Sequence, residues 1–189
     1  MIESRFKLRM MITSALFAAI IGVLAQVTIP LPLVPITGQT LAIGLAATIL
    51  GARYGTLSVV LYLCMGAIGM PVFAEMKAGL GILLGPTGGY LIGFIPTAFI
   101  IGYYLEKTSF SVKNAVIANV IGMFVALAFG TVWLKIIANL SWTAAFISGF
   151  APFLIMGLLK AALAAWAGIA VRNRLKSTNL LTARSVEAK

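Results

Sequence analysis

Lys160 is the residue whose type and position most suggest chemistry, because it is a cation inside an apolar run. It stands in Leu158-Leu-Lys-Ala-Ala162, near the middle of the last apolar segment. An ammonium at the centre of a membrane helix costs roughly 2.5–3.5 kcal/mol on insertion scales. About ten residues, or roughly 15 Å of helix, separate it from either end of that segment, which is farther than its four-carbon stem reaches. We therefore expect Lys160 to line a cavity, where it would suit an anionic or carbonyl-bearing ligand.

A second group of candidates opens an earlier apolar run, in Gly85-Pro-Thr-Gly-Gly-Tyr90. Pro86 suits the first turn of a helix, Thr87 can hydrogen-bond free N–H groups, and a helix N-terminus attracts anions. The same residues also suit a helix start that packs closely on a neighbour. Tyr90 offers a ring and a hydroxyl to a ligand or to the membrane interface. Just before this run, Lys77 lies in a glycine-rich stretch that would either fold over a ligand or remain solvated.

Other kinds of chemistry lack the residues that they need. The sequence has no histidine, and its four acids are all glutamates placed in expected tails or loops. This composition excludes haem ligation, histidine zinc sites and a Ser/His/Asp set, and it leaves no intramembrane acid for proton coupling. Residues 81–88 lack the lysine of a phosphate-binding P-loop. We expect no enzymatic activity, no cofactor, no metal and no energy source within the chain.

The elements that must position these residues are membrane helices. Of the 189 residues, 61% are hydrophobic and 10% are charged, whereas soluble domains carry about a quarter charged residues. A spanning helix needs about 20 mainly apolar residues. The sequence therefore predicts an all-α polytopic membrane protein, a single domain over 1–189 that is a bundle of six transmembrane helices with a polar C-terminal tail over 174–189. The expected helices are 10–29, 36–52, 56–73, 86–105, 112–137 and 149–171.

The basic residues predict the orientation of the bundle and argue against nucleic acid as a partner. The formal charge is +10, but the cations lie at the ends of apolar runs rather than on one polar face. With the N-terminus inside, only Lys77 and Lys135 fall in outer loops. The cytoplasmic cations would be Arg5, Lys7, Arg9, Arg53, Lys107, Lys113, Arg172, Arg174, Lys176, Arg184 and Lys189. This bias places both termini in the cytoplasm.

Several motifs, in order, closely resemble the BioY family, the biotin-capturing S components of energy-coupling factor (ECF) transporters. The motifs are Pro35-Ile-Thr-Gly-Gln39-Thr, Gly66-Ala-Ile-Gly-Met-Pro-Val-Phe73, Gly81-Ile-Leu-Leu-Gly-Pro-Thr-Gly-Gly-Tyr90, Pro152-Phe153 and Leu158-Leu-Lys-Ala-Ala162. The whole match covers essentially residues 10–172 with the expected order and spacing. The resemblance implies six helices in a bacterial cell membrane, with biotin held near the outer face. It also implies a separate transmembrane T protein and two ATPase subunits as partners. Ala15 and Ala19 match the alanine motif with which S components dock onto the T protein.

The resemblance also implies a set of ligand contacts, from which this chain departs. The implied binding residues are Gln39, Phe73, Lys77, Pro86, Thr87, Tyr90, Leu91, Gly157 and Lys160. In the usual family pattern an acidic residue precedes the lysine by three positions, and this position holds Gly157 here. Some members also carry a basic residue after the tyrosine, where this chain has Leu91. The loss of a buried acid removes an acceptor for the ureido N–H groups of biotin. Two alternatives therefore stay open: an S component for a related small heterocyclic vitamin, and a non-transporting membrane scaffold subunit.

Overall fold

The computed structural model describes residues 2–178, with side chains from Ser4 onwards. This part of the chain forms seven α-helices, one 3-10 helix and one two-stranded sheet. In chain order the elements are α1 (Ile2–Ala25), β1 (Thr28–Ile29), β2 (Ile36–Thr37), α2 (Gln39–Ala67), η1 (Ala74–Met76), α3 (Leu80–Leu84), α4 (Gly88–Lys107), α5 (Val112–Ile137), α6 (Trp142–Gly149) and α7 (Phe153–Ser177). Five of the helices, α1, α2, α4, α5 and α7, are long and apolar enough to cross a membrane. The all-helical membrane architecture expected from composition is therefore confirmed.

α2 reverses direction at Gly51, so its two halves lie side by side. The amide nitrogen of Gln39 donates to the hydroxyl of Tyr62 at 2.5 Å, although a straight helix would separate these residues by about 35 Å. Gly51 has φ 82° and ψ −172°, a left-handed conformation that favours glycine. A Cβ at Gly51 would also collide with the carboxylate of Glu106. The predicted helices 36–52 and 56–73 place this hairpin two residues later, at 53–55.

Side chains from α4 and α7 hold this reversal in place. The backbone N–H of Ala52 donates to Glu106 Oε1 at 2.8 Å, and Nη1 of Arg172 donates to the carbonyl of Ile49. The Arg172 guanidinium also lies 3.4 Å from the centroid of the Phe110 ring. The expectation that Glu106 lies in a loop is wrong, because α4 continues to Lys107. Its carboxylate satisfies an N–H that the broken helix leaves unpaired.

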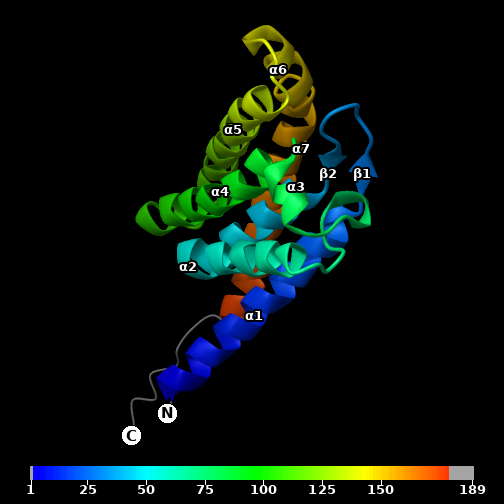
Figure 1. Cartoon of the computed structure of the whole chain (residues 1–189). Helices are drawn as coiled ribbons and strands as arrows, with labels where there is room; N and C mark the ends of the chain where they lie inside the picture. Colours follow the sequence, from blue (N-terminus) through cyan, green and yellow to red (C-terminus); the bar gives the residue numbers. More distant parts are fainter. Residues whose placement is uncertain (1, 179–189) are drawn as a thin grey trace, which may run out of the picture.

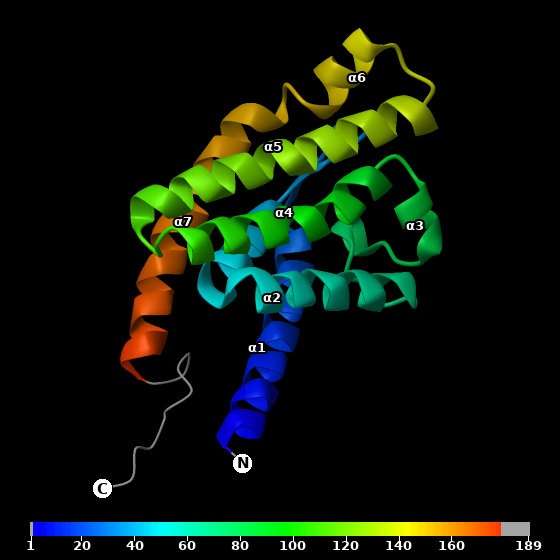
Figure 2. The ribbon, with the colours of Figure 1, turned by 90° about the vertical axis from the view of Figure 1, so that its left-hand side faces the viewer.

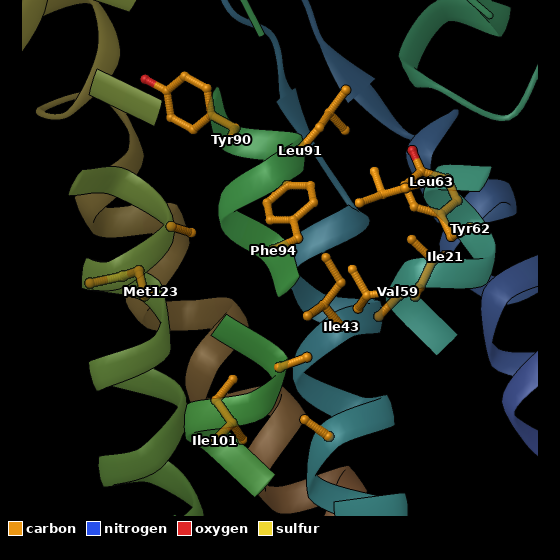
Figure 3. Close-up of a cluster of buried hydrophobic side chains, with 14 of the residues drawn as sticks. Ile21, Ile43, Val59, Tyr62, Leu63, Tyr90, Leu91, Phe94, Ile101 and Met123 are labelled. Carbon is orange, nitrogen blue, oxygen red and sulfur yellow. The ribbon is translucent and has the colours of Figure 1, made fainter. Parts of the chain in front are cut away.

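The helices pack around α4, which lies between α2 and α5 (Figure 2). α7 packs against both α2 and α5, and α1 packs against α2. Gly93 allows the close approach of α4 to α5, since a Cβ there would lie 2.7 Å from the Cβ of Phe129. Buried apolar residues of α1, α2, α4 and α5 form the core (Figure 3).

The shorter elements gather near one end of the molecule, where α4 begins and α5 ends (Figures 1 and 2). β1 and β2 pair antiparallel, with Thr28 opposite Thr37, and they enclose the proline-rich loop 30–35. α1 therefore ends at Ala25, before the predicted limit of 29, and α2 begins at Gln39 rather than 36. Proline lacks an N–H and disfavours a helical predecessor, which explains why helix does not continue through this loop.

The other predicted limits differ for local reasons. The expected segment 56–73 ends at Ala67, because the chain turns at Gly69 with φ 103°. α4 begins at Gly88 rather than 86, after the separate helix α3. The segment 112–137 coincides with α5, which Ser111 caps by accepting a hydrogen bond from the N–H of Asn114. α7 covers 153–177 instead of 149–171, so the first residues of the predicted tail are helical, and 179–189 lie outside the described residues.

Candidate functional site

A cavity of about 330 Å³ opens between α2, α4, α5 and α7, beneath the β1–β2 loop and the 73–87 segment. This volume lies at the lower end of the range typical of small-molecule sites. All nine residues that the sequence predicts as ligand contacts line it. They are Gln39, Phe73, Lys77, Pro86, Thr87, Tyr90, Leu91, Gly157 and Lys160. Segments from across the chain therefore meet at one cavity, although contact with a ligand stays a prediction.

Lys160 carries its charge into the cavity wall. Its Nζ donates to the carbonyl oxygen of Thr37 at 2.7 Å and to Oγ1 of Thr40 at 3.3 Å. Because α7 begins at Phe153, Lys160 lies about two turns from the start of the helix. The expectation that it lies mid-helix is therefore wrong. The ammonium links α7 to the start of α2, and it has a third N–H with which to meet a ligand.

Gln39, next in sequence to Thr40, lines the cavity, and the buried hydroxyl of Tyr62 is one of its partners within the protein. Gln39 is 5% exposed, its carbonyl accepts from the Thr37 hydroxyl at 2.7 Å, and its amide nitrogen donates to Tyr62. Both ends of the Gln39 amide therefore have partners within the protein. Its role in the wall is to hold β2 and the two halves of α2 together, which fixes the carbonyl that Lys160 contacts.

Tyr90 presents its ring to the cavity rather than its hydroxyl. The hydroxyl donates to the carbonyl of Gly149 at 2.6 Å, which ties α4 to the end of α6. The ring lies 5.9 Å from that of Phe153 at the start of α7. It covers Gly130 of α5 so closely that a Cβ at that position would meet the ring atoms. The Tyr90 ring therefore forms an apolar part of the cavity wall, because its hydroxyl already has a hydrogen-bond partner within the protein.

Phe73 and the segment after it form the cover of the cavity. The Phe73 ring is 1% exposed, lies over Gly66 and meets the Tyr62 ring edge-on at 5.6 Å. Gln26, the residue that follows α1, fixes this segment: its side-chain amide nitrogen donates to the carbonyl of Phe73 at 3.0 Å, and its side-chain carbonyl accepts from the N–H of Met76 at 2.9 Å. These contacts join the cover to α1 and α2 rather than leaving it free.

Lys77 lies at the rim and is already paired. Its Nζ is 2.7 Å from Glu75 Oε2, and the two side chains are 54% and 41% exposed. Such exposed pairs contribute little, about 0–1 kcal/mol. Lys77 can therefore turn towards a ligand at low cost, whereas the Lys160 ammonium is the cation held within the wall.

Leu91 and Phe94 continue the apolar wall along α4 below Tyr90 (Figure 3). Pro86 and Thr87 line the cavity at the start of the same helix. Thr87 precedes α4 without making a side-chain cap. This side of the cavity therefore offers mainly packing, with the Thr87 hydroxyl as a polar group near the rim.

Gly157 faces Met123 of α5, and both residues line the cavity. A Cβ at Gly157 would lie 2.5 Å from the sulfur of Met123 and 3.1 Å from its Cγ. Methionine therefore fills the space that a side chain at 157 would enter. No carboxylate is present among the described lining residues, so the cavity carries positive charge without a countercharge inside it.

The arrangement suits binding rather than catalysis. Aliphatic and aromatic side chains make most of the wall, and Lys160 supplies a charged donor to one part of it. The described residues contain no cluster of histidine, cysteine, aspartate or glutamate that could hold a metal. A small amphipathic molecule with an apolar body and an anionic or carbonyl group fits these features.

Sequence reasoning missed Asn119, which lines the cavity from α5 and is 4% exposed. The feature that could have indicated Asn119 is a polar residue within an apolar segment, which is also the feature that indicated Lys160. Thr97 of α4 was also missed; its hydroxyl hydrogen-bonds to the carbonyls of Gly93 and Gly122 at 2.8 and 3.2 Å.

Ala15 and Ala19 lie away from the cavity, on an exposed face of α1. Large apolar residues flank them on that face, including Met11 at 55%, Leu16 at 59% and Val23 at 69% exposure. The structure leaves these two alanines accessible to lipid or to another protein.

Known proteins similar to this chain are transport proteins. The model of the BioY family matches residues 1–177. The biotin transporter BioY2 of Lactococcus lactis subsp. cremoris is 41% identical over 165 residues, which cover 87% of this chain and 91% of that protein. The biotin transporter BioY of Thermotoga maritima is 41% identical over 158 residues, covering 84% and 92%.

A solved structure shares the fold. The crystal structure of the S-component for biotin from an ECF-type ABC transporter is similar with a TM-score of 0.81 and 31% sequence identity, covering 88% of this chain and 92% of that one. The named relatives and this neighbour are transporters and not enzymes. On the family match and on this similarity in sequence and fold, the chain belongs to the BioY family.

Proposed function

We propose that this protein is the substrate-capturing S component of an ECF-type vitamin importer and that it binds biotin. The observation that carries the proposal is the cavity, which all nine predicted contact residues line and into whose wall Lys160 brings an ammonium. The relatives named above are biotin transporters. Lys160 would meet a carbonyl or carboxylate oxygen of biotin, and Phe73, Tyr90 and Leu91 would pack its apolar parts.

We infer six membrane-crossing segments with cytoplasmic termini. Each half of α2 would count as one crossing. The first half, Gln39 to Leu50, has about 12 residues and a length of roughly 18 Å, so the β1–β2 hairpin would complete its crossing. The distribution of lysine and arginine supports placing the cavity entrance on the outside. A bacterial cell membrane is the proposed location, because the two relatives named above are bacterial.

The energy for transport would come from partner subunits, a transmembrane T protein and two ATPases. The chain has no phosphate-binding loop of its own. We propose that the T protein docks on the exposed face of α1 at Ala15 and Ala19, where small side chains permit close helix approach. Ala15→Trp should prevent assembly with the T protein and leave the affinity for biotin unchanged. Co-purification with the T protein would check the first effect, and a direct binding assay would check the second.

An S component for a related small heterocyclic vitamin is the second candidate. Gly157 favours it, because the usual family pattern has an acidic residue at this position and Gly157 lines the cavity. A cavity without a carboxylate has fewer acceptors for the ureido N–H groups of biotin. The scaffold alternative lacks comparable support, since a purely structural subunit needs no cavity around a cation.

Binding and accumulation can be tested separately. The purified chain in detergent should retain labelled biotin, and other vitamins should not displace it. The chain alone in ATP-free vesicles should not accumulate biotin, and accumulation should require the T protein, the ATPases and ATP. Preferential displacement by another vitamin would favour the second candidate. Accumulation by the chain alone would contradict the dependence on partners.

A further inference from the structure

Asn119 lies in the cavity wall with a polar atom that the fold does not use. It stands on α5, one turn before Met123, and its side chain reaches Thr48 of α2. It is 4% exposed and lines the cavity. Gly44 of α2 makes room for it, since a Cβ at Gly44 would collide with Asn119 Oδ1.

The orientation of the Asn119 amide follows from its neighbours. Nδ2 lies 2.8 Å from the carbonyl oxygen of Ala115 and 3.0 Å from Oγ1 of Thr48. A main-chain carbonyl can only accept a hydrogen bond, so the group facing it must be the NH₂. Both amide hydrogens are therefore engaged, and Oδ1 points the other way.

Oδ1 has no hydrogen-bond partner among the residues that the structure describes. The fully enclosed side-chain atoms without a partner in this part of the chain are Thr56 Oγ1, Thr131 Oγ1 and Arg172 Nε. Asn119 Oδ1 is not one of these, so it retains access to open space, and the cavity is the space that Asn119 lines. Buried acceptors are nearly always paired, which indicates an occupant that donates a hydrogen bond.

Other polar side chains of the wall are already engaged within the protein. Gln39 has partners at both ends, and the hydroxyls of Tyr90 and Thr97 reach main-chain carbonyls. Asn119 thus keeps a free acceptor, whereas Lys160 keeps a free donor. A ligand that carries both a carbonyl and an N–H, such as an amide or a cyclic urea, offers a partner to each of these two groups.

We propose that Asn119 Oδ1 accepts a hydrogen bond from an N–H group of the captured ligand. In this role Asn119 supplies, from α5, a hydrogen-bond acceptor that Gly157 of α7 cannot supply because it has no side chain. The inference rests on the proposed function as a biotin-binding S component. It assigns Asn119 a part in specificity, since a ligand without an N–H would leave Oδ1 unpaired.

The test compares Asn119→Ala with Thr48→Val in equilibrium binding of labelled biotin to the full chain in detergent. Thr48→Val removes the same hydrogen bond between α2 and α5 but leaves Oδ1 in place, so it is the matched control. Asn119→Ala should weaken biotin binding at least about fivefold, because it leaves a buried N–H without an acceptor. Thr48→Val should stay within about twofold of the native protein. Thermal unfolding of both variants measures how much stability each substitution removes.

A ligand-side measurement keeps the test independent of how the variant folds. Biotin methylated at either ureido nitrogen is titrated against the native protein, and methylation of at least one nitrogen should weaken binding. Equal affinity of both methylated forms and biotin would overturn the inference. So would unchanged biotin binding by Asn119→Ala, or an equal loss in Thr48→Val. If the native protein does not bind biotin, the proposed function and the inference fail together, whereas the preceding outcomes remove only the inference.

Discussion

Gly157→Asp introduces the acid of the family pattern into a site that Met123 fills. The new Cβ would lie 2.5 Å from the Met123 sulfur, whereas favourable heavy-atom contacts lie near 3.5–4.0 Å. Met123 must therefore move by about 1 Å, which its flexible chain allows in part. The aspartate would stand three residues before Lys160 on α7, a spacing at which helical side chains can pair.

The expected magnitude follows from these contacts. Overpacking costs roughly 1–3 kcal/mol, and a carboxylate near Lys160 offsets part of this by pairing with a cation that lacks a countercharge in the wall. Met123→Ala alone removes a side chain that is 9% exposed, and large-to-small substitutions of this kind cost about 2–5 kcal/mol. In the double variant the aspartate would occupy the space that methionine leaves. We expect a favourable coupling of roughly 0.5–3 kcal/mol between the two substitutions.

Thermal unfolding and biotin titration of four proteins in one detergent measure this coupling. The proteins are the native chain, Gly157→Asp, Met123→Ala and the double variant. The double variant should lose less stability than the sum of the two single losses, and it should bind biotin at least as tightly as Gly157→Asp. Additive losses would refute the conclusion that Met123 fills the space in front of position 157.

Three further substitutions test how the fold supports the cavity. Glu106→Ala removes the acceptor for the N–H of Ala52, so it should lower stability by about 1–3 kcal/mol in thermal unfolding without changing biotin affinity, because the reversal lies away from the cavity. Gly66→Ala drives a methyl group into the ring of Phe73 and should weaken biotin binding in titrations; unchanged affinity would show that the cover does not depend on this contact. Gln26→Ala removes the side-chain hydrogen bonds to the segment after Phe73 and should speed biotin release in a dissociation assay. An unchanged release rate would show that other contacts hold the cover in place.

The long elements could be predicted because composition and helix caps determine them. α5 coincides with the segment 112–137, which Ser111 opens and which ends before Asn139. The hairpin in α2 was expected almost at its true place. The reason for the hairpin could not be predicted, because the carboxylate of Glu106 reaches Gly51 only after α4 has packed against α2.

The short elements could not be predicted from local sequence. α3 has five residues and α6 has eight, lengths at which isolated helices are unstable in water. They exist because neighbouring segments support them: Trp133 donates to the carbonyl of Gly85 just after α3, and Tyr90 donates to that of Gly149 at the end of α6. Such contacts depend on the finished bundle.

The candidate site was predicted mainly through motifs, and its chemistry only in part. The nine residues meet in one cavity, but the sequence did not indicate that the amide of Gln39 and the hydroxyl of Tyr90 have protein partners. It also did not reveal that Met123 stands opposite Gly157. Asn119 escaped attention because an asparagine carries no charge, although it too is a polar residue that a membrane helix must pair.

Titration calorimetry of the purified chain with biotin, beside Lys160→Met, tests the central claim most directly. Methionine keeps the length of the side chain but removes the ammonium that donates to Thr37 and Thr40. A hydrogen bond to a charged group contributes about 1.5–3 kcal/mol, so the variant should bind roughly 10- to 150-fold more weakly. One-site binding by the native chain with this loss is the predicted result. No binding by the native chain, or equal affinity in both proteins, would contradict the account.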